Sequence, residues 1–355
     1  MAQRLSVGTL WPRHFPVDQF LARLGRPDRP VEVRSGYYQE SFEARGARRA
    51  RVAPEELAPL LPDLDEEARA VLGGAEVLLA LDVPAGVGSL APRLRWIHSI
   101  AAGIHHFDLA ELEAAGITLT TSAGASAVAI AEFTLARILQ ATKALRQFDD
   151  FQADRHWAPP AEWWDLADGR LLGELTLGVV GLGAIGRAVA ERAHALGMTV
   201  VANRRRRGTG PAPPSVDRLL GPDGLDEVLS GSDVVVLSLA ETDATLDLIG
   251  RRELGLMRPG ALLCNVARGT LVDEDALVEA LVSGRLGGAV LDVTRVEPLP
   301  PESPLWTTPG VYLSPHSASA HDKMTEHTIE IFADNVRRYL DGEPLRNRVD
   351  PAAGY

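Results

Sequence analysis

The chain has 355 residues, of which 46% are hydrophobic and 24% charged, and its formal net charge is -12 at pH 7. This length predicts two domains, and the negative charge argues against a surface that binds nucleic acid. Cys264 is the only cysteine, which excludes an internal disulfide and any metal site built on several cysteines. No apolar run reaches the ~18 residues needed to span a bilayer, so we expect a cytoplasmic protein without a membrane partner.

The first part of the chain alternates short apolar segments with helix-like ones. Strands are predicted at residues 4–10, 31–35, 77–83, 95–101 and 117–121, with helices between them that include residues 17–24 and 107–115. Such alternation predicts a parallel sheet covered by helices on both faces. We expect the first part of this domain to occupy residues 1–122.

The longest predicted helix covers residues 126–145, where apolar side chains recur on one face. After it, residues 148–172 are rich in Trp, Pro and Asp and have no clean periodicity. Exposed Trp157, Trp163 and Trp164 would be unfavourable in water, so we expect this segment to pack on a second copy of the chain in a homodimer. The alternative, that it folds back on its own domain, stays open.

A second alternating series predicts six strands, at residues 175–180, 199–203, 233–239, 261–266, 288–293 and 311–314. Six is the number of strands in two mononucleotide-binding halves. A final helix, at residues 321–340, is expected to return to the first domain. The predicted fold is therefore α/β with two doubly wound parallel-sheet domains. Residues 123–318 form the second domain, residues 319–355 complete the first, and hinges are expected near 122–124 and 317–321.

A glycine-rich turn joins the first strand of this series to a helix predicted at residues 187–196. The turn contains Gly181, Gly183 and Gly186 in the pattern G-x-G-x-x-G. Gly181 would make the tight turn, Gly183 would let backbone N–H groups approach a pyrophosphate, and Gly186 would let the helix pack closely on its strand. The helix N-terminus adds oriented donors for phosphate groups. The pattern therefore favours a dinucleotide site over a purely structural turn.

The next strand indicates which dinucleotide binds. An acidic residue about 20 positions after the glycines would accept hydrogen bonds from the adenosine ribose, but Arg204 stands there. A guanidinium is a good partner for a 2′-phosphate, so we predict NADP (NADPH) as the preferred cofactor, with Asn203 and Arg205 assisting and NAD still possible. The alternative interpretation is a solvated run of charges on a loop.

Three polar residues, Arg268, Glu297 and His316, follow later strands at the points where the apolar runs end. In an open parallel sheet the carboxyl ends of the strands line the ligand crevice, so these side chains are candidates for one site. Each has an ordinary explanation by itself, as a surface arginine, a turn glutamate or a hydrogen-bonded histidine. Their order after a nucleotide fold is more specific than any one of them.

In this order the motifs resemble those of the D-isomer-specific 2-hydroxyacid dehydrogenase family, and most closely its NADPH-preferring glyoxylate and hydroxypyruvate reductase branch. The resemblance covers residues 77–345. It is carried by GVVGLGAIG at 178–186, LLCNVARGTLVD at 262–273, LDV at 291–293, EPLPP at 297–301 and SPH at 314–316. It implies a Rossmann nucleotide-binding domain and a flavodoxin-like substrate domain, with the active site in a cleft between them.

The resemblance implies a role for each of the three polar residues. Arg268 would bind the substrate carboxylate and polarise the neighbouring carbonyl group. His316, as an imidazolium, would protonate the carbonyl oxygen while hydride passes from the nicotinamide to C2. Glu297 would hold the other ring nitrogen of His316 and favour its charged form. The implied reaction is reduction of a small 2-oxo acid, such as glyoxylate or hydroxypyruvate, to the D-2-hydroxy acid.

The resemblance also extends the site. It implies that Asp292 lies by the nicotinamide and that the backbone of Ala102, Gly103 and Ile104 faces the substrate carboxylate. The set expected to contact the cofactor is completed by Ala184, Ile185, Leu239, Ala240, Val266 and Ala267.

One position departs from the family, which commonly has Asp where this chain has His105, followed by His106. The departure affects the substrate side of the site and leaves the general mechanism intact. We expect no metal at this pair, because adjacent residues rarely point the same way and no other cluster of ligands is evident.

A rival hypothesis is a nucleotide-sensing, corepressor-like binding protein with little turnover. Relatives of that kind can retain Arg268, Glu297 and His316, so these residues do not exclude it. Their basic or peptide-binding appendages are not evident in this sequence, which favours the enzyme.

Overall fold

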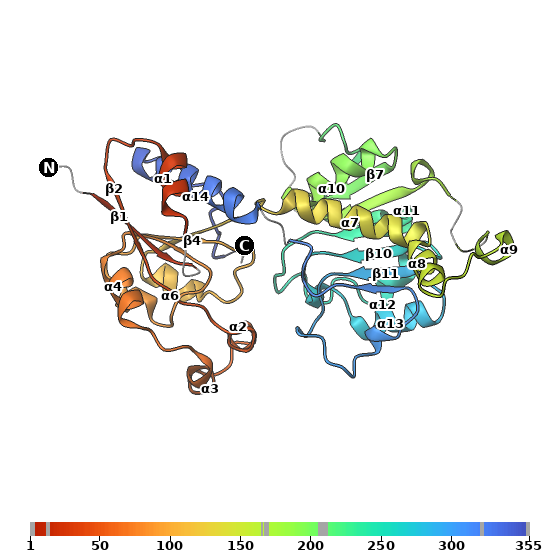
Figure 1. Cartoon of the computed structure of the whole chain (residues 1–355), viewed down its shortest axis with the longest axis horizontal. Helices are drawn as coiled ribbons and strands as arrows, with labels where there is room; N and C mark the ends of the chain where they lie inside the picture. The colour runs from red at the N-terminus through yellow and green to blue at the C-terminus, as the bar shows by residue number, and fades with distance from the viewer. Residues whose placement is uncertain are drawn as a thin grey trace. The chain divides into compact units, whose positions relative to one another are not determined.

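The computed structural model describes residues 4–11, 15–164, 166, 170–204, 212–319 and 323–352. The chain divides into two compact units, one formed by Met1–Ala125 with Asp322–Tyr355 and the other by Ser126–His321. The predicted domain boundaries lie at 122/123 and 318/319. Each unit is built on one parallel sheet with helices around it (Figure 1).

The described residues of the first unit form a five-stranded sheet in the order β2-β1-β3-β4-β5, all parallel. This is the flavodoxin-like order. The strands are β1 (Leu5–Leu10), β2 (Val31–Ser35), β3 (Val77–Ala80), β4 (Trp96–Ser99) and β5 (Thr118–Thr121). The helices are α1 (Val17–Leu24), α2 (Phe42–Arg49), α3 (Pro54–Leu57), α4 (Glu66–Gly74), α5 (Val87–Leu90), α6 (Leu109–Ala114) and α14 (Met324–Asp341).

Each face of this first sheet has its own hydrophobic core. Alternate residues of β3 point to opposite faces: Leu79 packs with α1 and α14, whereas Leu78 packs in the core that α4 covers. The aromatic ring of Phe20 in α1 stacks on Phe332 in α14, with ring centroids 5.1 Å apart. The C-terminal helix α14 therefore covers the same face as α1, and Figure 1 shows the two helices side by side.

The described residues of the second unit form a seven-stranded parallel sheet in the order β12-β11-β10-β9-β6-β7-β8. The order reverses between β6 and β9, which makes this the switch point of a doubly wound nucleotide-binding fold. The strands are β6 (Thr176–Val180), β7 (Thr199–Asn203), β8 (Arg218–Leu220), β9 (Val234–Leu237), β10 (Leu262–Asn265), β11 (Gly288–Leu291) and β12 (Val311–Leu313). The helices are α7 (Ala127–Thr142), α8 (Leu145–Ala153), α9 (Pro160–Trp163), α10 (Ala184–Ala195), α11 (Leu225–Gly231), α12 (Arg251–Leu256) and α13 (Glu274–Val282).

Strand β9 shows how the second sheet is buried on both faces. Val234 and Val236 pack in the core covered by α7 and α10, and Val235 and Leu237 pack in the core covered by α11, α12 and α13. A strand covered on both sides needs apolar residues at every position, which is why continuous apolar runs predicted these strands well. The predicted fold class, two doubly wound parallel-sheet domains, is confirmed.

Two predictions about the elements of the second unit were wrong. The described part of the unit has a seventh strand, β8, that the sequence did not indicate. The helix predicted at 126–145 ends at Thr142, and the chain turns through Ala144, which has a left-handed φ of +53° before α8 begins. Within the described residues, no helix is long and apolar enough to cross a lipid bilayer.

Candidate active site

The glycine turn lies between β6 and α10, at the switch point of the second sheet. Gly181 has a φ of +93°, which L side chains rarely adopt. A Cβ on Gly186 would lie 2.3 Å from the Gly181 carbonyl oxygen, so only glycine lets the helix pack this closely. A Cβ on Gly183, the N-cap of α10, would meet no atom of the described residues within 4 Å. The turn therefore leaves open space in front of the helix N-terminus, which fits the pyrophosphate of a dinucleotide.

Asn203, at the end of β7, braces this turn. Its side-chain oxygen accepts a hydrogen bond from Gly181 N–H at 3.2 Å, and its backbone oxygen accepts one from Leu182 N–H at 3.1 Å. The prediction of a cofactor contact did not include this structural role. Arg204 follows, half-buried, with its backbone N–H bonded to Leu220 in β8 at 3.3 Å. Arg205, the other predicted helper, lies outside the described residues.

Arg268, Glu297 and His316 follow three neighbouring strands, β10, β11 and β12, at their carboxyl ends. The structure brings Glu297 and His316 into contact: the Nδ1 of His316 lies 2.8 Å from Glu297 Oε2. The other carboxylate oxygen of Glu297 accepts from Thr294 N–H at 3.1 Å. Glu297 and His316, two of the three residues proposed for one site, are therefore in direct contact, and Arg268 follows a strand at the same edge of the sheet.

The electrostatics of Glu297 fix the direction of its hydrogen bond to His316. Burial raises the pKa of Glu297, but the hydrogen bond and charge of His316, the Thr294 N–H and the charge of Arg268 together lower it below its ordinary value. An ionised carboxylate can only accept, so Nδ1 of His316 carries the hydrogen in this bond. The second ring nitrogen, Nε2, is then the atom that can exchange a proton with a substrate.

Asp292, at the end of β11, holds the segment that carries His316. Its carboxylate accepts hydrogen bonds from Ser314 Oγ at 2.7 Å, Ser317 N–H at 2.9 Å and Ala318 N–H at 3.1 Å. Its backbone oxygen accepts from His316 N–H at 2.8 Å. These bonds hold His316 at a φ of +53°, a strained conformation for a residue with a side chain. The carboxylate of Asp292, which we predicted to lie by the cofactor, is thus engaged with this loop.

Arg268 lies in the first residues after β10, between buried neighbours. Its side chain is partly buried, and one guanidinium nitrogen donates to the Ala267 carbonyl oxygen at 2.5 Å. The buried Asn265 side chain brackets it, donating to the Arg268 carbonyl oxygen at 2.8 Å and accepting from Ala267 N–H at 3.1 Å. Asn265 therefore fixes the backbone from which the Arg268 side chain extends.

The remaining predicted cofactor residues come from the same edge of the sheet. Ala184 and Ile185 form the first turn of α10, and the others follow the carboxyl ends of β9 and β10: Leu239, Ala240, Val266 and Ala267. Of this set, Val266 and Ala267 are buried, whereas Ala240 is exposed.

In the first unit, the predicted substrate loop follows β4. Ala102 is exposed, Gly103 is half-buried and Ile104 is buried. Burial lowers the pKa of His106 against the opposing effect of its bond to Leu81, and Nε2 of the neutral ring donates to the Leu81 carbonyl oxygen at 2.7 Å. His106 therefore ties the loop to the end of β3.

The described residues contain no group of three or more His, Cys, Asp or Glu side chains placed to hold a metal ion. The half-buried His105 is followed by His106, whose ring is already bonded to a carbonyl oxygen. Cys264 is fully buried in β10, and burial raises the pKa of its thiol.

Sequence reasoning missed the residues that position the site, among them Asn265, Thr294 and Ser314. A buried amide at the end of an apolar strand was a usable signal for Asn265. Thr294 and Ser314 act through a backbone N–H and a hydroxyl group, and nothing in their residue type marks them.

A doubly wound sheet with a glycine turn and an Arg, Glu and His set at its carboxyl edge defines a dinucleotide-dependent oxidoreductase. Comparison with known proteins agrees. The family model for the NAD binding domain of D-isomer specific 2-hydroxyacid dehydrogenases matches residues 135–318. The chain belongs to the D-isomer specific 2-hydroxyacid dehydrogenase family, whose members act on CH–OH groups.

Relatives with assigned names point to one branch of the family. Glyoxylate reductase from Aeropyrum pernix is 37% identical over 272 residues, covering 74% of this chain and 78% of the relative. Glyoxylate/hydroxypyruvate reductase B from Pectobacterium carotovorum is 35% identical over 264 residues, covering 74% and 80%. A D-isomer specific 2-hydroxyacid dehydrogenase from Xanthobacter autotrophicus, solved with NADPH and MES, is 27% identical with a TM-score of 0.75 and covers 99% of this chain and 100% of its own. The expected resemblance is confirmed.

Proposed function

We propose that this protein reduces a small 2-oxo acid of the glyoxylate or hydroxypyruvate type to the D-2-hydroxy acid, with NADPH as the preferred hydride donor. The observation that carries the proposal is the 2.8 Å bond between His316 and an ionised Glu297, next to the charge of Arg268. The relatives named glyoxylate reductase support the substrate class. A cytoplasmic location is part of the proposal, because the reaction consumes NADPH that metabolism must regenerate.

The glycine turn fits a dinucleotide, because Gly183 leaves open space before the N-terminus of α10. Bound NADPH would supply the hydride that C2 of the substrate receives. Arg268 would bind the substrate carboxylate and polarise the C2 carbonyl group. His316 would donate the proton on Nε2 to the carbonyl oxygen, which becomes the hydroxyl group, while Glu297 stabilises the charged ring before transfer. Solvent then returns a proton to His316.

The proposal also assigns the backbone N–H groups at residues 102–104 to the substrate carboxylate. The exposure of Ala102 and the bond that holds His106 to Leu81 support a fixed loop that reaches the surface at this point. His105, in place of the family's usual Asp, would then affect which 2-oxo acid is preferred.

The assigned roles are tested with Arg268→Ala and His316→Ala. Each variant should bind NADPH like the wild type, measured by nucleotide fluorescence, and lose roughly 10²- to 10⁴-fold in kcat. The matched control is His194→Ala, since His194 is an exposed histidine of the same unit, 3.7 Å from the carboxylate of Asp217 and at the end of α10 opposite the glycine turn. Near-normal turnover in either test variant would contradict the roles.

NADPH absorbance with a panel of 2-oxo acids then identifies the substrate. Consumption with glyoxylate or hydroxypyruvate supports the proposal. Tight NADPH binding with no consumption across the panel would instead favour the nucleotide-sensing alternative.

The NADPH preference is proposed from Arg204, at the end of β7 where an acid would otherwise accept the ribose hydroxyl groups. Replacing it with Asp removes a cation suited to a 2′-phosphate and introduces a repulsive carboxylate. Arg204→Asp should therefore raise the KM for NADPH and lower the KM for NADH. An unchanged ratio of the two initial rates would refute the assignment.

We also propose a homodimer that buries the segment at residues 148–172. Three of its described apolar side chains are unusually exposed, Trp157 by 98%, Trp164 by 73% and Leu171 by 67%. Surfaces of this kind are typical of protein interfaces. Light scattering should give twice the chain mass for the wild type and a smaller mass for the Trp157→Ser, Trp164→Ser double variant. A monomeric wild type would exclude the proposal.

A further inference from the structure

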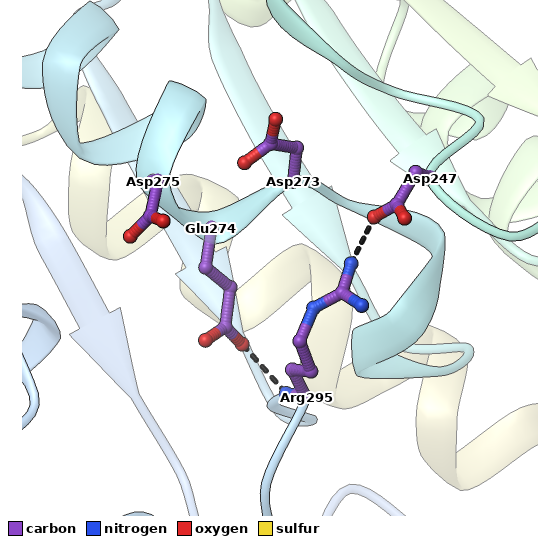
Figure 2. A pocket seen from close by; sticks show the side chains of 5 residues that line it. All are labelled: Asp247, Asp273, Glu274, Asp275 and Arg295. Atoms are coloured by element: carbon purple, nitrogen blue, oxygen red, sulfur yellow. Dashed lines mark hydrogen bonds and ion pairs between the residues drawn. The ribbon is translucent and has the colours of Figure 1, made fainter.

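A surface cavity of about 320 Å³ lies beside the candidate site in the second unit. Figure 2 shows its lining, one basic side chain among four acidic ones: Arg295, Asp247, Asp273, Glu274 and Asp275. Arg295 stands two residues before Glu297 in the loop after β11. The cavity wall therefore includes part of the segment that carries Glu297.

Arg295 is held at both its backbone and its side chain. Its backbone N–H donates to Glu274 Oε1 at 2.6 Å, at the start of α13. Its guanidinium group forms an ion pair with Asp247 and donates to the Val272 carbonyl oxygen at 3.2 Å. Figure 2 shows the bonds to Glu274 and Asp247 converging on Arg295 from two sides. Two segments outside the loop thus fix the position of one of its residues.

A close backbone contact joins the same loop to Arg268. A Cβ on Gly269 would lie 1.9 Å from the Thr294 carbonyl carbon and 2.3 Å from Arg295 N. The peptide bond between Thr294 and Arg295 therefore lies directly against Gly269, the residue that follows Arg268. Thr294 in turn donates its N–H to Glu297 Oε1 at 3.1 Å. A shift of Arg295 would move the donor that orients the Glu297 carboxylate.

The charges around this loop favour a cation at Arg295. Burial raises the pKa of Glu274, the N–H and charge of Arg295 oppose that rise, and the charges of Asp275 and Glu297 add to it. Glu274 and Glu297 are thus close enough to repel each other, and the cation of Arg295 lies among these carboxylates.

We propose that Arg295 is a positioning residue for the reaction, which anchors the loop after β11 to Glu274 and Asp247 and so keeps Glu297 in place on His316. The inference rests on the proposed function, because it assigns Arg295 an effect on the proton donor of that reaction. Arg295 acts through Glu297 and need not touch substrate or cofactor.

The test compares Arg295→Met, which removes the charge and the side-chain hydrogen bonds, with Arg295→Lys, which keeps the charge. In Arg295→Met we expect kcat to fall roughly 10- to 100-fold, as for a misplaced catalytic group, with the KM for NADPH unchanged. The low-pH limb of the kcat profile should move to higher pH, because a displaced Glu297 loses the hydrogen bond and charge of His316 that lower its pKa. Arg295→Lys should recover part of the lost kcat and part of the shift in the pH profile.

The matched control is Arg251→Met, which breaks an exposed ion pair with Glu279 elsewhere in the same unit and should leave kcat and its pH profile unchanged. A kcat within twofold of the wild type in Arg295→Met would overturn the proposal. So would a lower melting temperature with an unshifted pH profile, since that result indicates a structural role only. His316→Ala separates the two hypotheses: if it retains turnover, the proposed function fails, whereas if it is inactive and Arg295→Met is normal, only the positioning role fails.

Discussion

Replacing Gly186 with alanine tests the packing of the glycine turn. The added Cβ would lie 2.3 Å from the Gly181 carbonyl oxygen and 2.8 Å from Ser238 Oγ. That carbonyl oxygen cannot swing aside easily, because it is backbone and accepts a hydrogen bond from Ser238 Oγ at 2.7 Å. Helix α10 or the turn must therefore shift as a body.

The expected loss of stability follows from two opposing effects. Overpacking against a rigid backbone atom costs up to ~3 kcal/mol. Replacing a helical glycine with alanine returns about 1 kcal/mol, because alanine has the higher helix propensity. The net loss of about 2 kcal/mol should lower the melting temperature of a unit of this size by roughly 4 to 8 °C.

The matched control is Gly183→Ala, three residues earlier in the same turn. Gly183 has an extended backbone that alanine adopts easily, and its Cβ would meet no described atom within 4 Å. Without nucleotide, the melting temperature of Gly183→Ala should match that of the wild type. Its NADPH affinity, measured by calorimetry, should fall at least about tenfold if the pyrophosphate approaches this residue closely.

The two variants can refute the reasoning independently. An unchanged melting temperature for Gly186→Ala would mean that the start of α10 yields to an added methyl group. Wild-type NADPH affinity in Gly183→Ala would mean that the pyrophosphate does not lie over the turn.

Two further predictions concern buried polar groups. His98 is fully buried, which lowers its pKa from the ordinary value of 6.5 to about 3. As the pH falls below 6.5, the unfolded chain therefore binds a proton at His98 and the folded chain does not. The free energy of unfolding should therefore fall by about 2 kcal/mol between pH 8 and pH 5. Urea unfolding of His98→Gln should lack this part of the fall. An identical pH dependence in the variant and the wild type would contradict the prediction. Asp292→Asn weakens the charge-assisted bonds to Ser314 and Ser317 that hold His316. Its kcat should fall roughly 10- to 100-fold, and a kcat within twofold of the wild type would count against this support.

The sequence predicted the buried strands well and missed one edge strand of the second unit. Strand β9 is apolar at every position because helices cover both of its faces. Strand β8 has three residues, none of them buried, and pairs only with β7 among the described strands, so it carries no such pattern. Tertiary pairing alone makes it a strand.

The end of α7 was missed for a related reason. Ala144 and the residues around it favour a helix, so local propensity predicted that the helix continues. The structure instead places Ala144 in the left-handed region with its side chain buried. Packing of that methyl group, which no local pattern encodes, accompanies the break between α7 and α8.

The sequence predicted the candidate reacting groups of the site, but not the residues that hold them in place. Arg268, Glu297 and His316 stand out because charged or titratable side chains follow apolar strands. Arg295 follows the same strand as Glu297, yet its partner Asp247 is 48 residues earlier in the chain, and no spacing rule connects them. Supports of this kind become visible only when the loops are folded against one another.

The register of the second sheet explains why residues so distant in sequence can act together. Asn265 pairs with Leu291, and Leu291 pairs with Leu313, so the ends of β10, β11 and β12 form one row across the sheet. Neighbouring strands lie about 4.8 Å apart, so the row spans only ~10 Å. Arg268 and His316 each come three residues after this row, and the loop that bears Glu297 leaves from its middle strand. The spacing of the three groups is therefore set by strand pairing and by the loops' anchors, whatever the length of the helices between them.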